Sequence, residues 1–349
     1  MERIKTLNQS LGLYRFQGRS KNPEKLMVIV DEMNLHMLEK IMHMEKSGIQ
    51  IIYILTDSVA VRARFKFRSR IYPVQANIRS LLRHDIVDEI ICCVSSLPEK
   101  YISEIKEVCR QFGVSLLVPP NIELSGLAIE RTRFIGNFSF HVLETSPRKR
   151  DIFVLKTFVE MAFASMALFV LSPLLLLIAL TIKSTSAGPV IFRQQRVGLR
   201  GRKFYIYKFR TMNADAERMK SALKEYNESD GPAFKIKNDP RVTAFGRILR
   251  KTGLDEIPQF YNVVKGEMSL IGPRPMLPNE VSEQQEWQLK RMCIKPGITC
   301  TWQIQLDRNK VSFEKWMRLD RDYVENWSVG TDLRIFFSTI KSIFVARGI

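Results

Sequence analysis

The chain has 349 residues, of which 45% are hydrophobic and 26% are charged. This balance is typical of a globular protein and excludes a disordered one. The formal net charge of +18 suits either a nucleic-acid-binding protein or a protein that lies on an anionic membrane surface. The five cysteines have no C-x-x-C spacing, which argues against a disulfide framework or a zinc site.

Residues 24–124 alternate short β-branched runs with helical patterns, the order typical of a parallel α/β sheet. We expect strands at 26–30, 49–55, 88–94 and 114–119, and helices near 34–47 and 99–112. The turn after the first strand reads Asp31-Glu32-Met33-Asn34 and contains no glycine. Because glycines let backbone amides approach a pyrophosphate, we interpret residues 1–130 as a Rossmann-like α/β domain with a degenerate nucleotide loop.

Five basic residues alternate with Ala, Phe and Ser between positions 62 and 70. As a strand, this stretch would place five cations on one face. Such a face suits an anionic ligand or lipid surface, or equally a sheet edge protected from aggregation by its charges. The polar, basic stretch 131–150 contains Pro147 and is expected to be an interdomain linker.

Residues 161–182 form an uncharged run that is long enough to cross a hydrocarbon core of roughly 30 Å. Pro173 interrupts this run and would clash with the carbonyl of Phe169 in a straight helix, so we expect a sharp bend. Basic residues flank both ends, which the positive-inside rule places on the cytoplasmic side. We favour a re-entrant helix, in which the Ser172 hydroxyl satisfies freed backbone, over a spanning helix or a buried core helix.

The acidic pair Asp255-Glu256 stands among arginines within residues 239–275. Gly253 interrupts the preceding helical pattern and Pro258 follows, so the pair is expected at a helix N-terminus, where free N–H groups favour negative charge. All four histidines precede the apolar run, which leaves carboxylates as candidates for chemistry here. One carboxylate can attack phosphorus and the other can hold Mg²⁺ facing a pyrophosphate. The alternative interpretation is a solvated helix cap.

The last helical pattern covers residues 333–344 and gathers most of its apolar side chains on one side of a helical wheel. A helix at a membrane surface and a helix packed on a core share this pattern. We prefer the membrane-surface interpretation because a membrane anchor already precedes it.

The second half of the chain resembles the bacterial sugar transferases known as monotopic phosphoglycosyl transferases, which move a sugar 1-phosphate from a UDP-sugar to polyprenyl phosphate. The matching stretches run in order through 146–349: Ser172-Pro173, 186–212, 239–275, KPGIT at 295–299, Trp302-Gln303 and 322–333. The α/β region resembles the extra domain of the long, exopolysaccharide-initiating members. The four-helix membrane bundle usual ahead of that domain is not found in this sequence.

The resemblance implies that Asp255 is the nucleophile, that a covalent phosphosugar intermediate forms as UMP leaves, and that Glu256 binds Mg²⁺. It implies further that substrate phosphates are bound by Arg250, Lys208, Arg210, Arg274 and Arg308, and that Pro273-Arg274-Pro275 forms the polyprenyl-phosphate motif. Three positions depart from the family pattern: Gly253 stands where serine is frequent, and Cys300 and Leu306 replace glycines. The last two lie near the expected sugar or uridine pocket and bear on the choice of sugar more than on the chemistry. Long members of the family commonly handle glucose or galactose, so the resemblance makes a hexose the first expectation, and other sugars stay open.

The expected organisation is an accessory domain at 1–130, a linker at 131–150, a re-entrant membrane helix at 151–183 and a mainly α, membrane-embedded catalytic domain at 184–349. We expect it on the cytoplasmic face of a bacterial inner membrane, where it initiates exopolysaccharide, capsule or O-antigen assembly. The expected partners are a UDP-sugar, polyprenyl phosphate and anionic inner-leaflet lipids, with no nucleic acid and with a homodimer left open. Two alternatives are a glycosyltransferase that releases UDP and a basic scaffold that binds membrane or nucleic acid.

Overall fold

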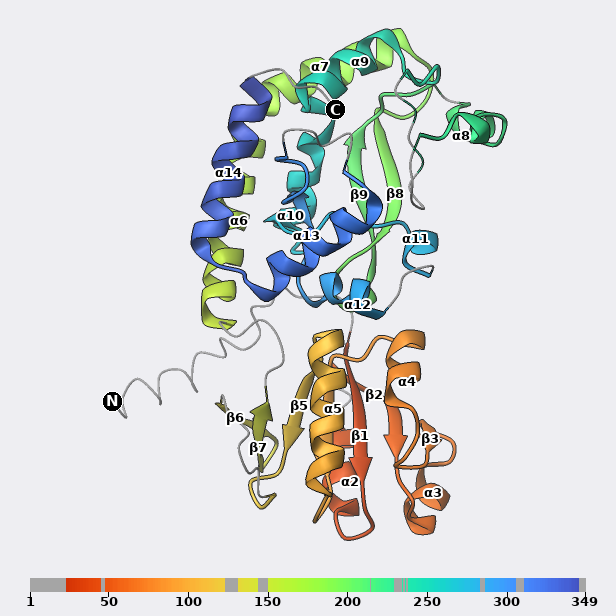
Figure 1. The fold of residues 1–349 in the computed structure, drawn as a ribbon, viewed down its shortest axis with the longest axis vertical. Helices are drawn as coiled ribbons and strands as arrows, with labels where there is room; N and C mark the ends of the chain where they lie inside the picture. Colours follow the sequence, from red (N-terminus) through yellow and green to blue (C-terminus); the bar gives the residue numbers. More distant parts are fainter. Residues whose placement is uncertain are drawn as a thin grey trace. The chain divides into compact units, whose positions relative to one another are not determined.

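The structure, a computed structural model, describes residues 23–44, 48–122, 131–143, 150–213, 215–228, 234, 236, 238–282, 286–305 and 311–344. The chain divides into two compact units, with Ser20–Arg148 in one and Lys149–Ile349 in the other. We call these the α/β unit and the transferase-like unit, and describe each by itself (Figure 1).

The α/β unit is a seven-stranded sheet in the order β3-β2-β1-β4-β5-β7-β6. The first five strands in this order pair in parallel. β7 pairs antiparallel with both β5 and β6. Its elements are β1 (Glu24–Val30), α2 (Leu35–His43), β2 (Ile49–Leu55), α3 (Val59–Phe65), β3 (Arg70–Tyr72), α4 (Ile78–His84), β4 (Glu89–Cys93), α5 (Glu99–Phe112), β5 (Ser115–Val118), β6 (Arg131–Ile135) and β7 (Phe138–Leu143). The predicted α/β sheet is thus confirmed, as a mixed sheet rather than a purely parallel one.

Helices cover both faces of this sheet and create two apolar cores. On one face, α4 and α5 bury residues such as Leu82 and Ile105 against the strands. On the other face, α2 and α3 bury residues such as Leu38 and Val61. Strands enclosed on both sides are mostly apolar, which explains the hydrophobic stretches LMVIV in β1 and IICC in β4. At the end of β1, the carboxylate of Asp31 accepts the backbone N–H groups of Asn34 and Ser95.

Two predictions for this unit are wrong. Residues 62–70 do not form a strand with five cations on one face, because α3 ends at Phe65 and β3 begins only at Arg70. The Ser58 side chain caps α3 by accepting from the N–H of Val61, and Val61 and Phe65, one helical turn apart, are both buried. The stretch 131–150 is not simply a linker, because β6 and β7 extend the sheet as far as residue 143.

The transferase-like unit is mainly helical. Its elements are α6 (Arg150–Val170), α7 (Ser172–Thr185), β8 (Ile191–Val197), β9 (Lys203–Phe209), α8 (Ala216–Ala222), α9 (Ala244–Thr252), α10 (Phe260–Val264), β10 (Ser269–Ile271), α11 (Pro278–Ser282), α12 (Glu286–Leu289), β11 (Gly297–Thr299), α13 (Phe313–Glu325) and α14 (Val329–Phe344), with 3₁₀ turns η3 (Leu199–Gly201), η4 (Lys224–Tyr226), η5 (Leu254–Gln259) and η6 (Lys290–Cys293). β8 and β9 form an antiparallel hairpin, and β10 and β11 pair in parallel.

The apolar run contains a helix break at the predicted position. α6 ends at Val170 and α7 begins at Ser172, with Leu171 between them. The Ser172 hydroxyl donates to the carbonyl of Phe169 at 2.7 Å, the carbonyl that Pro173 leaves without its helical N–H partner. The broken helix and the role of the serine are therefore confirmed, whereas insertion in a membrane stays a prediction.

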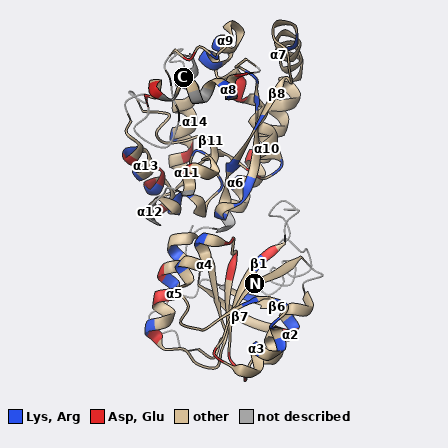
Figure 2. Ribbon diagram, turned by 90° about the vertical axis from the view of Figure 1, so that its right-hand side faces the viewer, with Lys and Arg blue, Asp and Glu red and all other residues tan. Residues whose placement is uncertain are grey.

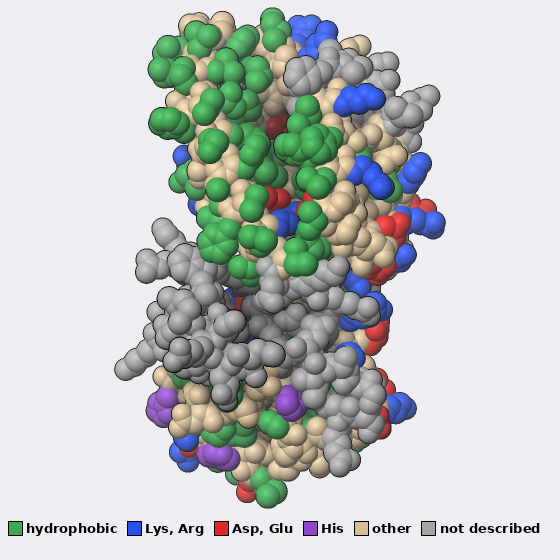
Figure 3. Space-filling model, turned by 90° about the vertical axis from the view of Figure 1, so that its left-hand side faces the viewer, with side chains coloured by type: hydrophobic (Ala, Val, Ile, Leu, Met, Phe, Trp, Pro, Cys, Tyr) green, Lys and Arg blue, Asp and Glu red, His purple; other side chains and the backbone are tan. Residues whose placement is uncertain are grey.

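Large apolar side chains remain exposed along the two segments of the broken helix and on α14. The exposed residues include Leu155, Val159, Met166, Phe169, Leu176, Leu177, Leu180, Leu333 and Phe337. Figure 3 shows hydrophobic side chains gathered over this side of the transferase-like unit, and Figure 2 shows α7 almost free of charged residues. α6 is long and apolar enough over Ile152–Val170 to cross a membrane. Within α14, Ile335 is buried in a core cluster, so that helix is only partly available to an external apolar phase.

Candidate active site

The acidic pair lies in the first turn of η5, between α9 and α10. The Thr243 side chain caps the start of α9 by accepting the N–H of Gly246. α9 ends at Gly253, whose φ of 71° lies in the left-handed region that favours glycine. This turn lets η5 begin at Leu254, with Asp255 and Glu256 in its first turn. The predicted placement of the pair after a helix break is confirmed.

Asp255 is a buried carboxylate, only 6% exposed. Its Oδ1 atom has no hydrogen-bond partner among the described residues. Burial, and secondly the charge of Glu256, raise the pKa of Asp255 to about 6, against the attraction of Lys208 and Arg250. Burial therefore outweighs the helix N-terminus that we expected to favour the ionised form. Because this pKa lies below neutral pH, the ionised form of Asp255 still predominates at pH 7.

Glu256 sits in a pocket lined by basic side chains. The Lys208 ammonium lies 2.5 Å from its Oε1, and Arg196 and Arg274 line the same pocket together with Gln259. Burial pushes the pKa of Glu256 upward, but the combined attraction of Lys208, Arg274 and Arg196 outweighs it and leaves the pKa below its usual value. Although Arg196 also lies 3.9 Å from Glu280, the pocket lining itself holds three cations and one carboxylate, a positive surplus that can bind a phosphate. We call this the carboxylate pocket.

The β8–β9 hairpin brings Lys208 and Arg196 to the same pocket. Arg196 pairs with Phe204 across the hairpin, and residues that pair across strands share a face. Alternation along β9 puts Phe204, Ile206 and Lys208 on that face as well. The sequence analysis did not predict a role for Arg196. The alternation of side chains along the two strands would have indicated it only if their register had been known.

Arg250 and Arg210 occupy different surroundings. The Arg250 Nε donates to the Thr211 hydroxyl at 2.9 Å, and the Asp255 carboxylate is the charge that most favours the protonated guanidinium. Arg210 instead donates to the carbonyls of Ser186 and Pro189 and to the Ser186 hydroxyl. It therefore fixes the chain after α7, and its binding of phosphate stays a prediction.

Three further residues from the sequence analysis are Cys300, Leu306 and Arg308. Arg308 and Leu306 lie outside the described residues. Cys300 is buried, and burial raises the pKa of its thiol well above the usual value. It is therefore an inert packing residue, and we assign it no chemistry.

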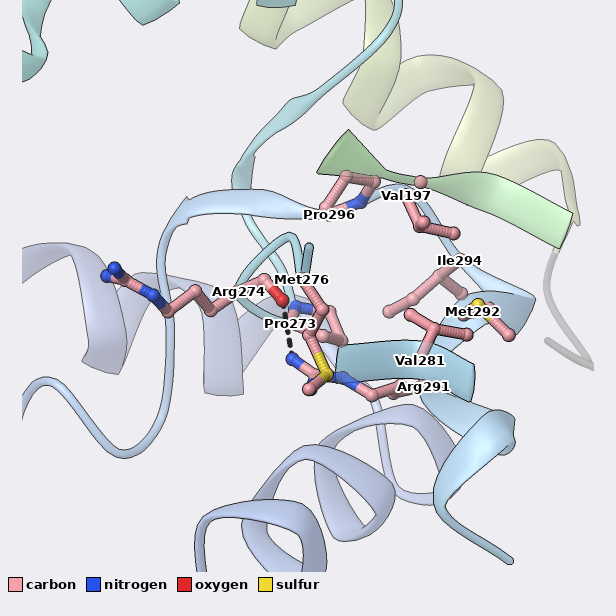
Figure 4. Close-up of a pocket in the computed structure, with 10 residues that line it drawn as sticks. Val197, Pro273, Arg274, Met276, Val281, Arg291, Met292, Ile294 and Pro296 are labelled. Carbon is pink, nitrogen blue, oxygen red and sulfur yellow. Dashed lines mark hydrogen bonds between the residues drawn. The ribbon is translucent and has the colours of Figure 1, made fainter. Parts of the chain in front are cut away.

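The Pro273-Arg274-Pro275 segment follows β10 and lies against the chain that leads into β11. Gly272 and Gly297 approach so closely that a side-chain Cβ at Gly297 would lie 2.1 Å from the Gly272 nitrogen. Both positions therefore require glycine, because a side chain on either would clash with the backbone of the other segment. Beyond the segment is a small apolar pocket, with Val197, Met276, Val281, Met292 and Ile294 in its lining (Figure 4). The Arg274 side chain extends away from that pocket.

Comparison with known proteins agrees with this arrangement. Residues 152–346 match the bacterial sugar transferase family. The chain belongs to this family. The match covers the broken helix, the acidic pair and the carboxylate pocket, so the family resemblance recognised in the motifs is confirmed.

Curated relatives of this sugar transferase come from several bacteria. It is 40% identical over 239 residues to the galactosyl transferase CpsE of Streptococcus agalactiae, covering 68% of this chain and 53% of the relative. It is 35% identical over 255 residues to the undecaprenyl-phosphate galactose phosphotransferase of Salmonella typhimurium, which covers 70% of this chain and 52% of the relative. It is 40% identical over 192 residues to the exopolysaccharide production protein ExoY of Rhizobium meliloti, covering 53% and 83%. The chain thus spans about half the length of the first two relatives.

Proposed function

We propose that the protein transfers a sugar 1-phosphate from a UDP-sugar to a polyprenyl phosphate and thereby initiates assembly of a surface polysaccharide. The observation that carries this proposal is the buried Asp255, with one unpartnered oxygen, beside a pocket that holds more positive than negative charge. Relatives named as undecaprenyl-phosphate galactose or glucose phosphotransferases support the same chemistry. Their names favour a hexose as the transferred sugar.

In the first step, an Asp255 oxygen attacks the phosphorus that bears the sugar. The bond from this phosphorus to the bridging oxygen breaks, and that oxygen leaves with UMP. Lys208, Arg196 and Arg274 line the pocket where phosphate oxygens would lie, and their charges stabilise the negative charge that develops on the leaving group. Because Asp255 is buried, little water competes with it as a nucleophile.

In the second step, an oxygen of polyprenyl phosphate attacks the same phosphorus. The bond to Asp255 breaks, the carboxylate is regenerated, and a polyprenyl diphosphate sugar is released. Both steps place phosphate groups in the same pocket, so one set of cations serves two substrates in turn. A ping-pong scheme is the kinetic consequence.

Glu256 is suited to hold Mg²⁺. The described residues contain no group of three or more His, Cys, Asp or Glu that could surround a metal ion. Mg²⁺, however, is commonly bound by one or two carboxylates together with substrate phosphates, and Glu256, in the carboxylate pocket beside Asp255, provides one such carboxylate. When bound, Mg²⁺ would neutralise charge on the diphosphate. Lys208 would then have to give up part of its contact with Glu256.

The nucleotide product tests the reaction. Purified protein incubated with a panel of UDP-sugars and polyprenyl phosphate should release UMP. An ordinary glycosyltransferase would release UDP, and release of UDP alone would contradict the proposal. A basic scaffold would release neither nucleotide and would show a nucleic-acid affinity that falls steeply with salt.

We also propose that the broken helix enters the cytoplasmic leaflet and returns to the same side. The exposed apolar side chains of α6, α7 and α14 support insertion, and the Ser172 contact shows how the chain satisfies its backbone at the bend. Labelling tests this topology with little background, because all five native cysteines are buried. Single cysteines introduced before α6 and after α7 should both react only from the cytoplasmic side. Reaction of one of them from outside would establish a spanning helix.

A further inference from the structure

A buried ion pair lies behind the Pro273-Arg274-Pro275 segment and takes no part in the chemistry described above. Arg291 in η6 is 4% exposed, and Asp320 on α13 is 1% exposed. Their Nη2 and Oδ2 atoms are 2.6 Å apart. Arg291 lines the apolar pocket of Figure 4 rather than the carboxylate pocket. Because desolvation offsets much of the attraction within a buried pair, stability alone does not account for this one.

Each carbonyl of the three-residue segment accepts a hydrogen bond from a different element. The carbonyl of Pro273 accepts from the Gly297 N–H at 2.9 Å, and that of Pro275 accepts from Arg196 at 3.2 Å. The carbonyl between them, that of Arg274, accepts from Nη2 of Arg291, as Figure 4 shows. Proline has no N–H to donate, so these carbonyls are the main backbone groups through which hydrogen bonds can fix the path of the segment.

The same nitrogen of Arg291 contacts both Asp320 and the Arg274 carbonyl. The Arg274 carbonyl accepts a hydrogen bond from this nitrogen, whereas neither oxygen of Asp320 has a hydrogen-bond partner among the described residues, so Asp320 acts through its charge. Asp320 supplies the counter-charge without which a buried guanidinium would be costly. The pair therefore holds the Arg274 backbone at a defined position.

The side chain of Arg274 leads from this fixed backbone into the carboxylate pocket. It lines that pocket with Lys208 and Glu256, and its guanidinium carbon lies 5.9 Å from the centre of the Trp302 ring. A change in the backbone of Arg274 would therefore displace one of the pocket's cations. Small displacements matter because bidentate binding of a phosphate by arginine depends on geometry as well as charge.

We propose that Arg291, with Asp320 as its counter-ion, is a positioning residue that sets Arg274 for binding the phosphate groups of the substrates. The inference deepens the proposed function and rests on it. It assigns Arg291 no contact with substrate. Its effect on phosphate binding is transmitted entirely through Arg274.

Binding of inorganic pyrophosphate, measured by thermal stabilisation in the presence of EDTA, tests the inference without turnover. The variants are Arg274→Gln, the paired change Arg291→Met with Asp320→Leu, and all three changes together. The paired change removes both buried charges and roughly conserves volume, so the fold should tolerate it. We expect pyrophosphate affinity to fall at least about tenfold in Arg274→Gln and in the paired variant, with no further loss in the combined variant.

Two results would overturn the inference: wild-type affinity in the paired variant, or additive losses in the combined variant. Should the paired variant fail to fold, Arg291→Lys keeps a positive charge beside Asp320 but removes the fork of donors. It should also weaken pyrophosphate binding, and unchanged affinity would equally overturn the inference. A wild type that binds pyrophosphate but releases no UMP from any UDP-sugar would contradict the proposed function and leave the positioning role intact.

Discussion

Replacing Asp255 by Asn should abolish transfer and at the same time stabilise the folded protein. Asn cannot act as the nucleophile. The substitution also removes the desolvation cost of a buried charge with an unpartnered oxygen, and it removes the repulsion between that charge and Glu256. Residues selected for chemistry often reduce stability in this way.

The magnitude follows from the pKa. A shift from 3.8 to about 6 corresponds to about 3 kcal/mol of unfavourable free energy for the ionised form in the folded state. Asn retains a buried polar group, so we expect a gain of about 1–3 kcal/mol at pH 7, or several degrees in Tm for a unit of this size. The folded state binds the Asp255 proton more tightly than the unfolded chain. The contribution of Asp255 to wild-type stability should therefore fall as pH rises from about 4 to 6, and the advantage of the variant should vanish below about pH 4.

Thermal denaturation in detergent with EDTA, from pH 4 to 8, measures this difference. Asp239→Asn is the matched control, because Asp239 makes two hydrogen bonds through its carboxylate to the Arg241 guanidinium. Those bonds lower the pKa of Asp239, so the same chemical change there should destabilise the protein at pH 7. The reasoning would be refuted if Asp255→Asn lowered the Tm at pH 7, or if this variant kept near-normal turnover.

Further predictions concern the pocket and the turns that build it. Chelation of divalent cations should stop UMP release, and activity that persists in excess EDTA would contradict the proposed Mg²⁺ site. Lys208→Met should lower kcat/KM at least tenfold. Lys265→Met is the control, because it removes a cation that is paired with Glu267 outside the pocket, and it should change kcat/KM by no more than about twofold. Equal losses in the two variants would contradict the role of the pocket. Gly253→Ala should lower the free energy of unfolding by about 1 kcal/mol, because the backbone at this position has a positive φ. Denaturant titration measures this free energy, and an unchanged value would contradict the prediction.

The strongest sequence patterns predicted the elements that carry the site. Pro173 and Ser172 indicated where the long apolar helix breaks, because the chemistry of proline is local and does not depend on the rest of the fold. Gly253 likewise indicated the end of α9 and the start of the turn that holds Asp255. These features are read from single residues and their immediate neighbours.

Features that depend on long-range contacts were not predicted. Arg196 reaches the carboxylate pocket only through its register with β9, and Arg291 reaches Arg274 from a segment seventeen positions further along the chain. Alternation at 62–70 indicated a strand, but residues 62–65 belong to a helix that buries Val61 and Phe65, and residues 66–69 form the turn that leads to β3. Burial also reversed the expected pKa of Asp255, and burial is a property of the packed structure rather than of the local sequence.

The central claim is that Asp255 forms a covalent bond to the sugar phosphate. The most direct measurement is to incubate the enzyme with a UDP-sugar in the absence of polyprenyl phosphate, quench it in acid, digest it and analyse the peptides by mass spectrometry. The account predicts that the peptide containing Asp255 gains the mass of one sugar phosphate, and that subsequent addition of polyprenyl phosphate removes it. An unmodified Asp255 peptide together with full turnover, or a modification on another residue, would contradict the account.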